Sequence, residues 1–61
     1  MASLNQIELQ NLRQIIGQHD MIREKYQAYA QQAMDQQVRD YFEQGAQEAA
    51  KTKQQLMTFL K

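Results

Sequence analysis

The sequence predicts an all-α fold, an antiparallel two-helix hairpin that pairs with a second copy to complete a four-helix bundle. Two apolar stripes with steps of three and four residues predict the two helices. Proline is absent and glycine occurs only twice, so few residues interrupt these stripes. A single domain of 61 residues buries little surface, and the absence of cysteine rules out disulfides, so oligomerisation is the expected source of further stability.

The first helix is expected over about residues 4–34. Ser3 and Gln6 have the spacing of a capping box, in which each side chain bonds the backbone amide of the other residue. The apolar stripe then repeats at steps of three and four and therefore lies on one side of the helix. It consists of Leu12, Ile15, Ile16, His19, Ile22, Tyr26, Tyr29, Ala30 and Ala33.

A turn is expected at about residues 34–36, and a second helix at about 36–60. Asp35 is a suitable N-cap for this helix, because its carboxylate can accept hydrogen bonds from amides of the first turn. The stripe of the second helix consists of Val38, Phe42, Gly45, Ala49, Thr52, Leu56 and Phe59.

Folding the chain back near residue 35 places Tyr29 opposite Phe42 and Tyr26 opposite Gly45. Large side chains of the first helix thus meet small ones of the second, as dense packing requires. Two helices cannot enclose a core on all sides, so a second hairpin is expected to cover the edges. The residues predicted to pack in the core and the dimer are Leu12, Ile15, Ile16, Ile22, Tyr26, Tyr29, Val38, Phe42, Gly45, Ala49, Leu56 and Phe59.

The composition narrows the range of partners and compartments. Seven basic and seven acidic residues give a balanced charge, and no basic stripe indicates a nucleic-acid partner. No apolar run approaches the roughly 20 residues that span a bilayer, so no membrane partner is expected. The N-terminus lacks the pattern of a signal peptide, which favours the cytoplasm. The 13 glutamines, interrupted regularly by apolar residues, are expected to form an amide-rich solvent face.

His19 and Glu48 are the only candidates for a metal site at the core of the dimer. Di-metal sites in helical bundles use a Glu-x-x-His element, but the matching fragment here, residues 48–51, ends in Lys51, whose ammonium is not a ligand. The simpler reading is a histidine at the edge of the core, hydrogen-bonded to Thr52 or Glu48. Asp20 and Glu24 are expected to face away from the seam. No metal, cofactor or catalytic residue is therefore expected, and the chain is not expected to be an enzyme.

The run at the turn, Ala33-Met34-Asp35-Gln36-Gln37-Val38-Arg39-Asp40-Tyr41-Phe42, resembles the spore coat protein F family. Glu24-Lys25-Tyr26 and Ala30 add to this resemblance, which covers roughly residues 9–60. Two features depart from the family pattern, because Gln36 stands where the family turn has proline and the Glu-x-x-His element is missing. The resemblance implies a ferritin-like hairpin in a protein of the spore coat, with other spore-coat proteins as partners, and it does not imply iron oxidation.

The leading hypothesis is therefore a homodimeric structural or interaction protein, cytoplasmic or deposited in the spore coat. The alternative is a ferritin-like metal-binding or redox protein that uses His19 and Glu48. A third reading is a regulatory coiled-coil module that exchanges partners.

Overall fold

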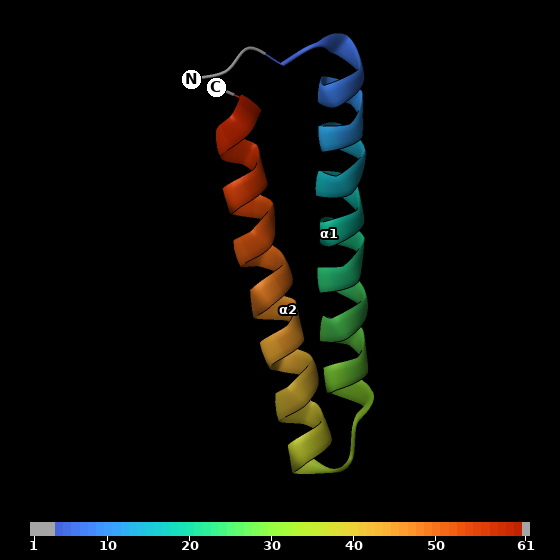
Figure 1. Cartoon of the computed structure of the whole chain (residues 1–61). Helices are drawn as coiled ribbons and strands as arrows, with labels where there is room; N and C mark the ends of the chain where they lie inside the picture. The colour runs from blue at the N-terminus through green and yellow to red at the C-terminus, as the bar shows by residue number, and fades with distance from the viewer. Residues whose placement is uncertain (1–3, 61) are drawn as a thin grey trace.

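The computed structural model describes residues 4–60, which form two helices joined by a short turn (Figure 1). Helix α1 spans Gln6–Gln32, and α2 spans Gln36–Met57, followed by η1, a 3-10 helix over Thr58–Leu60. The two helices pack side by side and run antiparallel, so that the start of α1 lies near the end of α2. The predicted all-α hairpin is confirmed, and residues 4–60 contain no strand.

The start of α1 is fixed by its N-cap residue, Asn5. The Asn5 Oδ1 atom accepts a hydrogen bond of 2.8 Å from the Glu8 amide, and Glu8 Oε1 accepts one of 3.0 Å from the Asn5 amide. This is a complete capping box, with a carboxylate near the positive end of the helix dipole. The predicted cap at Ser3 lies outside the described residues, and the start predicted at about residue 4 was two residues too early.

The turn occupies residues 33–35, because α1 ends at Gln32 and not near residue 34 as predicted. Ala33 has an extended backbone, which stops the helix, and Asp35 is extended as well. The Asp35 carboxylate accepts a hydrogen bond of 3.0 Å from the Val38 amide, so the predicted N-cap of the second helix is confirmed. Arg39 reaches back across the turn, and its Nη2 atom donates a 2.9 Å bond to the Ala33 carbonyl oxygen.

The second helix was predicted to continue to about residue 60, but its α-helical part ends at Met57. The Thr58 hydroxyl donates a 2.6 Å hydrogen bond to the Gln55 carbonyl oxygen. Side chains that bond to a carbonyl of the preceding turn compete with the regular helical pattern. The last three described residues accordingly tighten into a 3-10 helix, which is common at helix ends.

The contact between the helices is held by aromatic rings near the turn and by small residues beyond it. The ring centroids of Tyr29 and Phe42 lie 5.4 Å apart, and those of Tyr26 and Phe42 lie 5.8 Å apart. Tyr26 also covers Gly45, as the predicted register requires. Among the described residues, the only buried hydrophobic side chains are those of Ala30, Ala46 and Ala49. The hairpin therefore has a seam, but no closed core of large side chains.

The overall shape is a slab. Its Cα atoms span 46 × 17 × 11 Å, and their radius of gyration is 14.4 Å. A compact domain of this length would have a radius of roughly 10–11 Å. Neither helix has a segment long and apolar enough to cross a membrane, within the residues that the structure describes.

Candidate interaction surface

One side of the hairpin is apolar, and we call it the apolar face. On α1, Ile15, Ile22 and Tyr29 recur at steps of seven and therefore share one flank of the helix. A hollow near the turn is lined by residues of both helices, including Tyr29, Val38 and Phe42, so the flanks of α1 and α2 lie on the same side. The apolar face comprises Ile15, Ile22, Tyr29, Val38, Tyr41 and Phe59.

These side chains reach well into solvent. Ile22, at mid-hairpin, is 40% exposed, while Tyr41 and Phe59, toward the two ends, are 69% and 56% exposed. A second hollow near the start of α1 is lined by Leu4, Leu12, Ile15 and Phe59 together with Glu8 and Asn11. Two apolar hollows on one exposed face are the shape into which side chains of another helix insert.

The opposite side of the hairpin is polar. Its groove has a floor of small residues, Ala30, Ala46 and Ala50, between walls of long polar side chains. These walls are formed by Arg23, Gln27, Gln31, Arg39, Glu43 and Gln47. The contrast between the two sides gives the hairpin one face suited to apolar association and one suited to contact with water.

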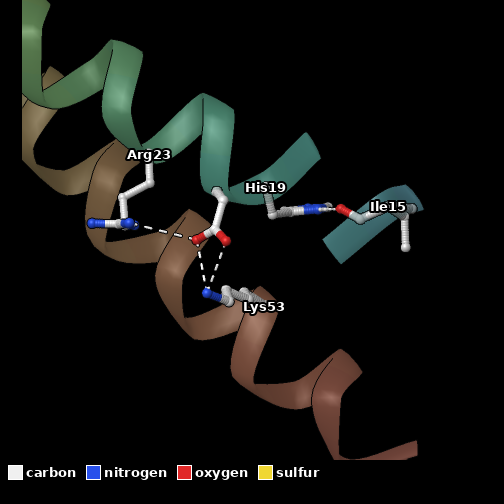
Figure 2. Close-up of polar contacts among 5 residues, drawn as sticks. Ile15, His19, Arg23 and Lys53 are labelled. Atoms are coloured by element: carbon white, nitrogen blue, oxygen red, sulfur yellow. Dashed lines mark hydrogen bonds and ion pairs between the residues drawn. The ribbon is translucent and has the colours of Figure 1, made fainter. Parts of the chain in front are cut away.

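Asp20 of α1 and Lys53 of α2 form an ion pair that links the two helices (Figure 2). The Lys53 Nζ atom donates to both carboxylate oxygens, at 2.8 and 2.9 Å, and Arg23 approaches the same carboxylate at 3.5 Å. The hydrogen bond from Lys53 is the main cause that lowers the pKa of Asp20 below its ordinary value of 3.8. The prediction that Asp20 faces away from the seam was wrong, because its side chain crosses to α2.

His19 lies half-buried on the seam side of α1, but it does not bond to Thr52 or Glu48 as predicted. Its Nδ1 atom lies 2.8 Å from the carbonyl oxygen of Ile15, one turn earlier in the same helix (Figure 2). A carbonyl oxygen only accepts hydrogen bonds, so Nδ1 carries the proton in this contact. Glu48 is exposed to solvent.

No metal centre is assembled within the described part of one chain. Residues 4–60 contain no group of three or more histidine, cysteine, aspartate or glutamate side chains placed to hold an ion. One ring nitrogen of His19 is hydrogen-bonded to the backbone, and the Glu48 side chain is exposed on α2. A single hairpin therefore offers two surfaces for association, the apolar face and the polar groove.

The structure brings together most of the residues that were predicted to pack. Tyr26, Tyr29, Phe42 and Gly45 meet near the turn, and Leu12, Ile15 and Phe59 meet at the other end. Ala49 is buried, and Ile16 and Leu56 are half-buried. The exposed members of the set, Ile15, Ile22, Tyr29, Val38 and Phe59, lie on the apolar face.

Two polar features escaped the sequence analysis. The pair Asp20–Lys53 fits the predicted register to within two residues, so opposite charges at matching positions were the signal that could have revealed it. The second is the Arg39 guanidinium, which holds the end of α1 and whose Nε atom is buried without a hydrogen-bond partner among the described residues. An arginine seven residues after the last residue of a helix can reach the final carbonyls, which carry the negative end of the helix dipole.

Comparisons with protein-family models, with curated proteins and with solved structures give no match for this chain.

Proposed function

We propose that this chain is a small structural or interaction protein that acts as a homodimeric four-helix bundle and carries no catalytic chemistry of its own. The exposed apolar face is the observation that supports this proposal. Ile15, Ile22 and Tyr29 of α1 and Val38, Tyr41 and Phe59 of α2 stand on one side of a slab whose opposite side is polar. A second hairpin placed on this side would complete the core.

The amount of exposed surface supports the same proposal. The chain exposes 5121 Å² to solvent. A compact folded monomer of this mass would expose roughly 4100 Å² on the usual scaling with molecular weight. The excess of roughly 1000 Å² is close to the roughly 800 Å² that each partner buries in a standard protein interface. One hairpin thus carries about as much surplus surface as one dimer contact removes.

The resemblance of the turn to the spore coat protein F family extends the proposal to a place of action. In this view the dimer is a ferritin-like bundle that associates with other proteins of the spore coat. The glutamine-rich exterior and the polar groove would remain outside the dimer and supply the next contact in a larger assembly. Contacts of this kind need shape and hydrogen-bonding groups, and they need no catalytic residues.

The test is a native mass spectrum combined with sedimentation of the purified chain, of Ile22→Glu and of Met21→Glu. Both substitutions replace an exposed apolar residue by a charge, but Ile22 lies on the apolar face and Met21 on the outer side of α1. We expect a dimer for the unmodified chain and for Met21→Glu, and a monomer for Ile22→Glu. An unmodified chain that is monomeric at all concentrations would overturn the proposal.

The same spectrum, recorded with added iron or zinc, tests the absence of metal chemistry. We expect no metal at a fixed ratio to the dimer. Metal retained at such a ratio would favour the ferritin-like metal-binding alternative, and His19 and Glu48 would be the first residues to substitute.

A further inference from the structure

We infer that the second copy packs on the apolar face with both turns at the same end of the bundle, which places Lys25 against the partner's Glu48. This inference rests on the proposed homodimer and adds the orientation of its two subunits. It follows from the position of two exposed charges that flank the apolar face at the same height along the hairpin.

Lys25 stands on the outer rim of the apolar face. It lies three residues after Ile22 and four before Tyr29, so the three side chains share a flank of α1. Its side chain is exposed, and the ion pairs formed by the described residues do not include it. A lone lysine beside an apolar surface keeps its ammonium in water while its stem lies along the edge.

Glu48 occupies the corresponding rim of α2. It lies seven residues after Tyr41 on the same flank, is exposed, and takes part in no ion pair among residues 4–60. The residue numbers of cross-helix contacts fix its height. Asp20 bonds to Lys53 and Tyr29 packs on Phe42, so residues directly opposite each other have numbers that add to between 71 and 73, while Phe42 also reaches Tyr26 almost one turn away. Lys25 and Glu48 satisfy the same relation, so they stand at one level on opposite rims of one face.

A two-fold axis parallel to the helices turns this arrangement into two ion pairs. Such an axis places α1 of each copy against α2 of the other and keeps every residue at its own height. Lys25 then faces the partner's Glu48, and Glu48 faces the partner's Lys25. On the same rims Gln18 faces the partner's Gln55, since these positions obey the same relation. The apolar side chains meet between these rims.

The opposite orientation, with the turns at opposite ends, brings like helices together. In that orientation α1 of one copy runs opposite to α1 of the other. If the two helices, each spanning Gln6–Gln32, are aligned at their centres, Lys25 lies at the height of the partner's Arg13. No acidic side chain of α1 lies within one turn of that height, because the nearest are Glu8 and Asp20. Charge complementarity therefore favours the arrangement with both turns at one end, because complementary charges across an interface set its register.

Charge reversal tests this orientation. The dissociation constant of the dimer is measured by sedimentation for Lys25→Glu, Glu48→Lys and the double variant. Arg13→Glu is the control for Lys25→Glu, because it makes the same change in charge outside the apolar face. We expect each single reversal to weaken the dimer roughly tenfold, because two attractions become two repulsions. The double variant should return to within about twofold of the unmodified chain. If the double variant lost affinity by the sum of the free-energy changes of the two single variants, the inference would be overturned.

Mixing the two single variants adds a second readout, since each supplies the charges that the other needs. With one variant labelled by ¹⁵N, native mass spectrometry should show more mixed dimer than the half expected by chance. A chance distribution would count against the inference.

Cysteine cross-linking gives a geometric check, because the chain has no cysteine of its own. Gln18→Cys combined with Gln55→Cys should form disulfides between subunits, and Gln18→Cys alone should not. Position 18 lies next to the centre of α1, so efficient cross-linking of the single variant would indicate opposed turns and overturn the inference. A chain that is monomeric before any substitution would instead contradict the proposed function itself.

Discussion

The ring of Tyr26 lies directly over Gly45, so closely that a Cβ atom at position 45 would be 2.5 Å from Cδ2 and Cε2 of the tyrosine. A glycine inside a helix costs about 1 kcal/mol relative to alanine, and here that loss allows the two helices to pack a large ring against a bare backbone. The Tyr26 ring also contacts Phe42, so it has little freedom to move aside.

Gly45→Ala should therefore lower the free energy of unfolding by about 1–2 kcal/mol, because the clash exceeds the gain in helix propensity. Gly17 is the matched control, since a Cβ there would meet no atom within 4 Å. Gly17→Ala should raise stability by about 1 kcal/mol. Urea denaturation at one fixed protein concentration compares the two. Equal stabilisation by both substitutions would mean that Tyr26 does not pack on position 45.

The ion pair Asp20–Lys53 should make stability depend on pH in the acid range. Lys53 lowers the pKa of Asp20 in the folded chain, so the contribution of the pair is fully present above the ordinary value of 3.8 and is lost as the pH falls through the lower folded pKa. Asp20→Asn should therefore destabilise the protein at pH 7 and have little effect at the lowest pH. Urea denaturation from pH 7 to pH 2 measures the difference. A difference that does not change with pH would contradict this contact.

His19→Leu separates a packing role of the histidine from a ligand role. Among residues 4–60, the ring bonds only to the Ile15 carbonyl oxygen, which belongs to the same helix, and leucine would add apolar surface to the seam. We expect unchanged stability or a gain of up to about 1 kcal/mol, with no effect on metal content. Denaturation and native mass spectrometry with added zinc measure both. Metal uptake that disappears with the substitution would identify His19 as a ligand.

The hairpin and its register were predictable, because each depends on spacing that the sequence displays. The steps of three and four define the apolar stripes, and Asp35 marks the start of α2 through its capping chemistry. The contacts of Tyr29 with Phe42 and of Tyr26 with Gly45 follow once the turn is placed.

The polar details were less predictable, because several partners compete for each group. The cap near the start of α1 was predicted at Ser3, whereas Asn5 forms a capping box with Glu8, its acidic partner three residues later. For His19 the nearest acceptor was its own backbone, which the side-chain pattern does not reveal. Asp20 lies at the margin of the stripe, where a small rotation of the helix decides between solvent and the neighbouring Lys53. The sequence predicted most of the residues of the apolar face, but the positions of Lys25 and Glu48 along its edges became visible only in the structure.

The three buried alanines have a consequence for how the protein would respond to its own abundance. A seam in which alanines are the buried hydrophobic residues stabilises a fold only weakly, so in the proposed dimer the hairpin would draw much of its stability from association. Under mass action, the melting temperature then rises with protein concentration. Copies present at low concentration would dissociate, unfold and become substrates for proteases, so that assembly itself would protect the chain from degradation.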